Sequence, residues 1–344
     1  MTRTLRGSFP LLILLAFAFA FNGCDEPNDP DLPRHPYTLV NQLTTQGIAK
    51  DVYMAGNLVA VAEDMYGALV LDATDPRALD TVFEYTNSPG GSCTQLALAP
   101  TLTYLCVFPQ DNFFYSVFNY SIPSMVEAQI PIGLSLNGPL GDMEVTAMVD
   151  TLFIWGTDMT ASDNFFTGLR YTRASDTSAW EFNPTNQSFV PSNGRVHGFD
   201  IRSDGIAAIA VEQQGVRLHR IDPFESLGLA GTPGLAYDCA WSGNYVVVAD
   251  QFQVVIVDAS DLMQPVVVSQ VRIPNADRLR QVAVDGNYAC VLDEYDGIYI
   301  VDISNPVSPQ YVQLLDLYDP TAVVAGNGRV YVTDEGNGLL VYSR

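Results

Sequence analysis

The chain has 344 residues, of which 48% are hydrophobic and only 16% are charged, and its formal net charge is −23. Lys50 is its only lysine. This charge balance excludes a protein whose folded part binds nucleic acid or an anionic membrane surface, and it predicts that any charged partner is cationic. The length allows one large β domain or two ordinary domains, and the repeat described below favours one.

The first 23 residues have the features of a signal peptide. Two arginines precede the apolar run Phe9–Phe21, which is short for a membrane span. The following residues, Phe21 to Cys24, resemble a bacterial lipobox, in which the cysteine becomes the lipidated first residue. Ordinary cleavage after Ala18-Phe19-Ala20 is the alternative and gives a soluble exported protein. We expect an exported protein of the bacterial cell envelope that is anchored in a membrane through Cys24, on the periplasmic side or the cell surface.

Residues 24–36 are rich in proline and aspartate. This composition prevents a packed core and favours an extended tether. The remaining residues, 37–344, then form a single folded domain.

A repeating unit with a period of about 43 residues dominates this domain. Each copy contains short apolar segments separated by a Gly-Asn turn and an acidic turn, which is typical of antiparallel β-structure. A period of this length built from strands predicts the blade of a β-propeller. The clear copies are Met54–Pro76, Trp241–Pro265, Gln281–Pro306 and the truncated Val324–Tyr342.

The spacing of the copies predicts an all-β propeller of seven blades. Weaker units fill residues 89–132, 138–186 and 193–234. Counted along the whole domain, the third unit is 138–186, and it is the most irregular. Six blades are the alternative if the third unit is an insertion. The chain stops within its last unit, and Tyr37–Gln42 is a strand without a nearby partner. We therefore expect this N-terminal strand to complete and close the last blade.

Three of the apolar runs end in an aspartate, namely Asp72, Asp258 and Asp302. The carboxylate at such a position accepts backbone N–H groups of the next residues, so these aspartates are interpreted as structural turn residues. The same runs resemble the LVIVD-repeat family of bacterial β-propeller proteins, most closely in Val255–Asp258 and Ile300–Asp302. The resemblance implies an exported, often surface-anchored propeller of the lipoprotein type. It implies no reaction, because the family shares a scaffold and not a site.

Acidic residues recur between the second and third strands of several units. Propeller geometry brings these turns to one end of the ring, where their carboxylates are expected to form an acidic face around the channel mouth. The face would attract calcium or a basic protein partner, although the same residues also suit ordinary hairpin turns. The candidate residues are Glu63, Asp64, Asp250, Asp293, Glu294, Asp296, Asp334 and Glu335.

Four cysteines remain after Cys24. Cys93 and Cys106 flank a turn, so a hairpin would place them at bridging distance, and the alternative is two buried thiols. Cys239 and Cys290 fit a second bridge or, better, two core cysteines.

The sequence contains no catalytic motif of the common kinds, and its histidines, His35, His197 and His219, are interpreted as incidental. We therefore predict a non-enzymatic binding or scaffold module for a protein or envelope component. A hydrolase or lyase that acts on an extracellular polysaccharide through the acidic loops is the alternative, and a calcium-stabilised propeller is another. No cofactor other than calcium is expected.

Overall fold

The computed structural model describes residues 35–86, 91–99, 104–109, 114–119, 126–131, 140–148, 151–159, 164–173 and 180–344. The predicted signal peptide, Cys24 and most of the tether lie outside these ranges. Contacts group Arg34–Arg344 into one compact unit. Within the described part of the chain no helix is long and apolar enough to cross a membrane.

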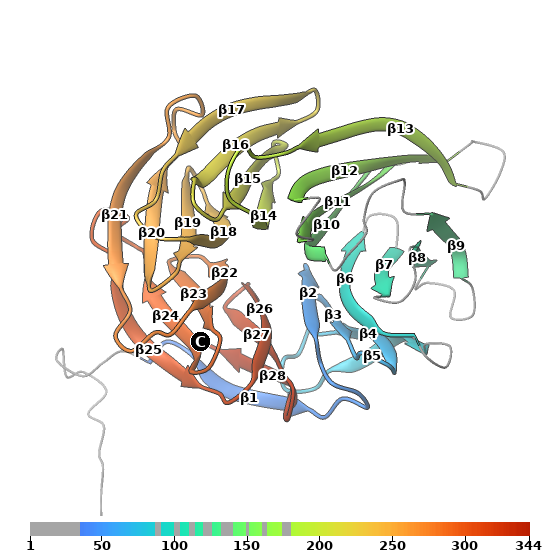
Figure 1. Ribbon diagram of the computed structural model, residues 1–344. Coiled ribbons are helices and arrows are strands. Elements are labelled where there is room, and N and C mark those ends of the chain that lie inside the picture. Colours follow the sequence, from blue (N-terminus) through green and yellow to red (C-terminus); the bar gives the residue numbers. More distant parts are fainter. Residues whose placement is uncertain are drawn as a thin grey trace, which may run out of the picture. The chain divides into compact units, whose positions relative to one another are not determined.

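The described strands form seven four-stranded antiparallel sheets, which are arranged in a ring (Figure 1). We number them as blades one to seven from the first complete sheet. Blade one contains β2 (Asp51–Ala55), β3 (Leu58–Ala62), β4 (Gly67–Asp72) and β5 (Asp80–Thr86), and blade two contains β6 (Cys93–Ala99), β7 (Tyr104–Pro109), β8 (Phe114–Asn119) and β9 (Val126–Pro131). Blade three contains β10 (Leu140–Met148), β11 (Thr151–Met159), β12 (Asn164–Arg173) and β13 (Trp180–Phe189).

The remaining blades follow the same order from the channel outwards. Blade four contains β14 (Val196–Arg202), β15 (Ile206–Val211), β16 (Gly215–Ile221) and β17 (Phe224–Ala230), and blade five contains β18 (Ala236–Ser242), β19 (Tyr245–Asp250), β20 (Gln253–Asp258) and β21 (Val266–Arg272). Blade six contains β22 (Leu279–Asp285), β23 (Tyr288–Asp293), β24 (Gly297–Asp302) and β25 (Gln310–Asp316). Blade seven contains β26 (Pro320–Gly326), β27 (Arg329–Asp334), β28 (Gly338–Ser343) and the N-terminal β1 (Thr38–Leu43).

The irregular third unit of the sequence is a complete sheet, β10 to β13, in the same strand order as its neighbours. Its strands are longer than those of the other blades, with nine or ten residues each. The unit is therefore a blade with extended hairpins and not an insertion between blades.

The middle strands are apolar on both faces because each sheet lies between two others. In β20 the residues Val254–Val257 are all buried, and one mixed core joins the apolar side chains of blades five and six. Each such run ends at a turn aspartate. The carboxylates of Asp72, Asp258 and Asp302 accept the backbone N–H two residues later at 2.8, 2.9 and 2.9 Å, which is the turn geometry that the sequence predicts.

The N-terminal strand β1 pairs with β28 and completes blade seven. Tyr37, just before β1, is 1% exposed, and its hydroxyl donates to the carboxylate of Asp285 in blade six at 2.6 Å. Arg344, at the other end of the chain, also donates to Asp285. Gln313 bonds both backbone groups of Tyr37. One carboxylate therefore binds residues from both ends of the chain and closes the ring.

Of the two alternatives for Cys93 and Cys106, the disulfide is not formed. Cys93 is a free, buried thiol, as are Cys239 and Cys290. The register of β6 and β7 pairs Cys93 with Pro109 and Cys106 with Ala97, so the two cysteines are not opposite each other. The side chain of Cys106 lies outside the described residues.

We expect Tyr37→Ala to lower the free energy of unfolding by about 4 kcal/mol, because it removes a large buried aromatic ring and leaves Asp285 with one donor fewer. Urea denaturation followed by tryptophan fluorescence measures the change. Tyr318→Ala is the matched control, since Tyr318 is 83% exposed, and should change the stability by less than about 0.5 kcal/mol. Equal effects of the two substitutions would contradict the proposed closure.

Candidate binding site at the mouth of the ring

The innermost strand of most blades contains a β-bulge near its first residues. In blades five, six and seven the extra residue is Tyr237, Arg280 and Thr321, and in blade two it is Thr94. Blade four has a wider irregularity at His197 and Gly198. A bulge bends the strand and re-aims the side chain of the extra residue, and bulges are frequent next to binding sites.

These bulge residues line one hollow at the end of the ring where the inner strands begin. The hollow has a volume of about 600 Å³, within the range of ligand pockets. We call it the mouth. Its lining includes Lys50, Thr94, His197, Tyr237, Arg280 and Thr321, one from each of six blades, together with Arg195, Glu212, Arg278 and Glu294 from neighbouring turns and loops.

In several blades a side chain near the start of the inner strand joins its blade to the next one. In blades one, three and five, the carboxylates of Asp51, Asp142 and Asp238 accept the backbone N–H of Leu96, Phe199 and Val282 in the next blade, at 3.0, 3.0 and 2.8 Å. Gln281 makes the same bond from blade six to Val323 at 2.8 Å. We call these side chains latches. Their bonds fix the inner strands against one another.

Blade four departs from this pattern because the latch position holds Gly198. A Cβ atom there would lie 1.9 Å from Oδ1 of Asp238, so glycine makes room for the latch of the next blade. Asp200, two residues later, bonds blade four to blade five instead, accepting the N–H of Trp241 at 2.7 Å.

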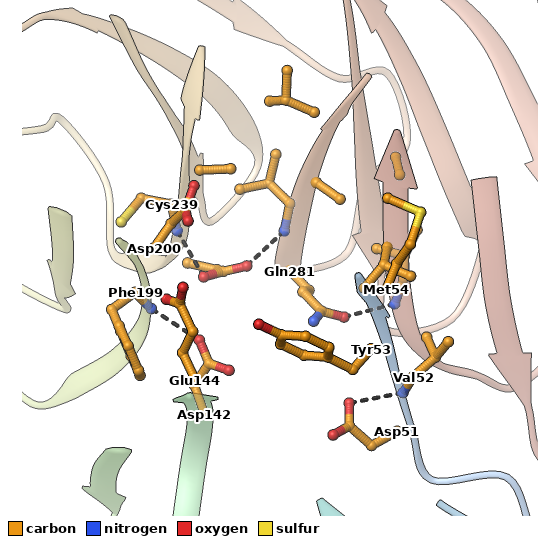
Figure 2. Close-up of a pocket in the computed structure, with 18 of the residues that line it drawn as sticks. Asp51, Val52, Tyr53, Met54, Asp142, Glu144, Phe199, Asp200, Cys239 and Gln281 are labelled. Atoms are coloured by element: carbon orange, nitrogen blue, oxygen red, sulfur yellow. Dashed lines mark hydrogen bonds between the residues drawn. The ribbon is translucent and has the colours of Figure 1, made fainter. Parts of the chain in front are cut away.

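The latches form the floor of the mouth and the start of a second cavity inside the channel, of about 270 Å³. Figure 2 shows Asp142, Glu144 and Asp200 on one side of this cavity, with Gln281 and Asp51 across from them. Burial raises the pKa of Asp51 to about 7 and that of Asp142 to about 6. Burial, followed by the charges of its neighbours, also raises the pKa of Glu144 well above its usual value. The channel wall is therefore a carboxyl-rich surface that retains protons near neutral pH.

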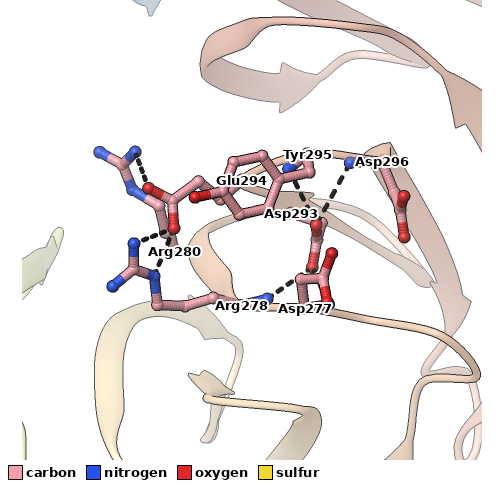
Figure 3. A network of polar contacts seen from close by, with 7 residues as sticks. All are labelled: Asp277, Arg278, Arg280, Asp293, Glu294, Tyr295 and Asp296. Atoms are coloured by element: carbon pink, nitrogen blue, oxygen red, sulfur yellow. Dashed lines mark hydrogen bonds and ion pairs between the residues drawn. The ribbon is translucent and has the colours of Figure 1, made fainter.

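The rim of the mouth, in contrast, gathers cations. Arg278 and Arg280 both pair with Glu294 (Figure 3). Arg195 is exposed and makes no ion pair with a described residue. Burial lowers the pKa of His197, and the charges of Arg195, Arg280 and Arg278 lower it further, while Glu212 raises it. These arginines therefore create a positive potential at the histidine.

The predicted acidic face is not present at the mouth. Four of its eight residues, Glu63, Asp250, Asp293 and Asp334, are at most 2% exposed. Asp293 accepts four backbone N–H groups, from residues 277, 278, 295 and 296, at 2.9 to 3.2 Å. The carboxylate thus ties its own turn to the loop that enters the same blade. The ordinary turn interpretation holds for these residues, and the interpretation as an exposed face is wrong for them.

The other four predicted residues have separate local partners. Asp64 accepts the hydroxyl of Ser92, Asp296 accepts the hydroxyl of Tyr299 at 2.8 Å, and Glu335 pairs with Lys50 at 2.8 Å. Glu294 is the one member of the predicted set that lines the mouth, and it is paired with two arginines. The structure does not bring the set together.

One trio of carboxylates, Asp277, Asp293 and Asp296, has ligand atoms within 4.8 Å of one another (Figure 3). Both oxygens of Asp293 already accept N–H bonds, and Asp296 bonds Tyr299. The trio is thus explained as turn chemistry.

The mouth residues were missed because they differ from blade to blade. What these residues share is only their place, directly before the position that Asp51, Asp238 and Gln281 hold in their blades; they are Lys50, Thr94, His197, Tyr237, Arg280 and Thr321. An alignment of the repeats with one another could have pointed to these residues. It shows one position at which the side chains vary from blade to blade, while the apolar residues beside it recur.

Comparison with known proteins supports the fold and leaves the site unassigned. Residues 233–272 and 278–316, which are blades five and six, match the LVIVD repeat. No curated protein matches the chain in sequence.

Solved β-propellers resemble the whole ring. The β-propeller domain of Cps50 (Swd1) from Myceliophteria thermophila matches with a TM-score of 0.62 and 10% identity, over 90% of this chain and 100% of that one. The WD40 β-propeller domain of Doa1 matches with a TM-score of 0.62 and 13% identity, over 90% and 98% of the two chains. A chain of a mitotic checkpoint complex matches with a TM-score of 0.66 and 12% identity, over 100% and 99%. At these identities the likeness concerns the fold alone.

We expect Asp293→Ala to lower the free energy of unfolding by about 3 kcal/mol, because it leaves several partly buried N–H groups without an acceptor. Glu335→Ala, the control, removes only an ion pair at the surface and should cost less than about 1 kcal/mol. Urea denaturation of both variants measures the difference. An Asp293 variant as stable as the control would mean that the carboxylate is not needed for the turn.

The channel carboxyls predict a pH dependence of stability. Their pKa values are higher in the folded than in the unfolded chain, so they stabilise the fold at low pH, and this contribution is lost as pH rises through about 6 to 7. Burial lowers the pKa of His219 to about 4. Below the ordinary pKa of a histidine, this residue therefore destabilises the fold as the pH falls. A variant is therefore needed to isolate the carboxyl contribution.

Asp51→Asn keeps an acceptor oxygen for Leu96 and removes the titration. We expect the difference in unfolding free energy, variant minus wild type, to increase between pH 5 and pH 8, as measured by urea midpoints. Asp316→Asn, at an exposed outer-strand position, should leave the difference constant. A constant difference for Asp51→Asn would contradict the raised pKa.

Proposed function

We propose that the protein is a non-enzymatic binding module of the cell envelope, tethered through Cys24, and that it binds a protein partner at the mouth of the ring. The observation that carries this proposal is the mouth itself. Six blades contribute side chains of different chemistry to one hollow on a rigid, hydrogen-bonded ring. The propeller fold and its LVIVD repeats support a binding or scaffold role, while export and tethering rest on the sequence of the first 24 residues.

The surface around the mouth suits a protein partner. The turn and loop tips at this end of the ring expose Met65, Tyr66, Tyr295 and Tyr318, with exposed fractions between 49% and 83%. Tyrosine, methionine and arginine are enriched at protein interfaces relative to other surfaces. The arginines at the mouth therefore form a polar centre, and the tyrosines beyond it surround this centre with amphipathic side chains.

The polysaccharide hydrolase alternative depended on exposed acids such as Asp293 and Asp334. Both are buried, and their carboxylates serve as acceptors within turns. The calcium alternative depended on the same loops, and no arrangement among the described residues favours it over turn chemistry. Both remain hypotheses from the sequence that lack a supporting site.

Photo-cross-linking in the native cell envelope tests the proposed function. A photoreactive phenylalanine analogue replaces Tyr237, which lines the mouth, or in a matched control Tyr311, which lies on the outer strand β25. We expect one polypeptide to be cross-linked from position 237 and not from position 311. Cross-linking of the same polypeptide only from position 311, or to equal extents from both, would contradict binding at the mouth.

A further inference from the structure

We infer that the mouth binds a peptide segment that presents a single carboxylate, either an aspartate or glutamate side chain or a chain terminus. This inference rests on the proposed function and specifies the chemistry of the partner. It also reverses the expectation from net charge, according to which any charged partner would be cationic.

The first argument is the local charge of the rim. Among the described lining residues, Lys50, Arg195, Arg278 and Arg280 are cationic; the carboxylates are Glu212 and Glu294 at the rim and Asp51, Asp142 and Asp238 at the floor. Lys50 also pairs with Glu335 at 2.8 Å. Glu294 is shared by two arginines, and Arg195 has no ion pair with a described residue. The rim therefore holds more positive than negative charge, in a chain whose formal net charge is −23. Guanidinium groups bind carboxylates through paired, charge-assisted hydrogen bonds.

The second argument is independent and concerns buried polar atoms. Oε1 of Gln95 and Nε2 of His197 are both buried without a hydrogen-bond partner among the described residues, and both residues line the mouth. Buried polar atoms in native proteins are nearly always paired, so an unpaired set at a hollow indicates a missing ligand or ordered water. The amide oxygen of Gln95 requires a donor, and because this atom is fully buried the side chain must turn towards the hollow to accept a peptide N–H.

The third argument separates a peptide from a polyanion. A uronic acid polysaccharide would have to continue past the rim over a strongly acidic molecule, where repulsion opposes it. A peptide places one negative charge between Arg195 and Arg280 and can cover the remaining surface with neutral groups. The tyrosines near the mouth provide contact area for such a segment.

The test is saturation-transfer NMR on the full chain, purified in mild detergent, at low salt. The probe is a capped pentapeptide with one glutamate among glycines and serines. The same peptide with glutamine, and a digalacturonate, are the comparison ligands. We expect the glutamate peptide to bind, and the glutamine peptide to bind at least about tenfold more weakly, which corresponds to one charge-assisted contact.

Variants locate the binding. Arg195→Gln with Arg280→Gln should weaken the glutamate peptide by about tenfold or more, and Arg195→Gln alone should show part of this loss. Arg77→Gln removes the same charge from an exposed outer turn and should have no effect. Normal thermal melting of each variant shows that its fold is intact.

Three results would overturn the inference: equal binding of the two peptides, no binding of either peptide, or binding of digalacturonate alone. Undiminished binding in the double variant would overturn it as well. Failure here is distinguishable from failure of the proposed function. Cross-linking from position 237 that persists in the Arg195→Gln, Arg280→Gln protein would leave the mouth as a binding site but exclude a carboxylate as its ligand.

Discussion

The ring depends on hydrogen bonds between blades, in which a side chain near the start of one inner strand accepts a backbone N–H of the next blade. Asp51, Asp142, Asp238 and Gln281 make such bonds. They hold carboxyl groups inside the channel, where burial disfavours the charged form and raises pKa values. The side chains that make these bonds therefore also give the channel its protonated carboxyl groups. Asp285 likewise joins parts of the ring by accepting hydrogen bonds, in its case from Tyr37 and Arg344 where the ring closes.

Much of the architecture was predictable, since the runs that end in Asp72, Asp258 and Asp302 recur at blade spacing and the unpaired Tyr37–Gln42 segment indicated closure. The site was not predictable in the same way. Asp293 and Asp334 looked like parts of an exposed face. The sequence of an acidic turn does not show whether its carboxylate points to solvent or accepts backbone N–H groups of the turn. His197 looked incidental and Arg280 carried no signal of its own, because only the bulge places them at the mouth.

The mouth joins two opposite electrostatic features. The floor contains carboxyls that retain protons, and at the rim above it burial lowers the pKa of His197 and the neighbouring arginines lower it further, while Glu212 raises it. A protonated carboxyl can donate a hydrogen bond and does not repel an anion, so the floor is compatible with a negatively charged group above it. Net charge of the whole chain was thus a poor guide to the charge of the rim, because four of the sixteen basic residues line this one hollow while three of its five carboxylates lie at the floor.

The most direct measurement of the central claim is an NMR titration of the histidine ring protons in the intact protein, with and without the glutamate peptide. The chain has only three histidines, so each resonance can be assigned by substitution. We predict that the pKa of His197 lies below its ordinary value in the free protein and rises when a carboxylate binds beside it, while that of the buried His219 does not change. An ordinary pKa for His197 that the peptide does not alter would contradict a cationic, carboxylate-binding mouth.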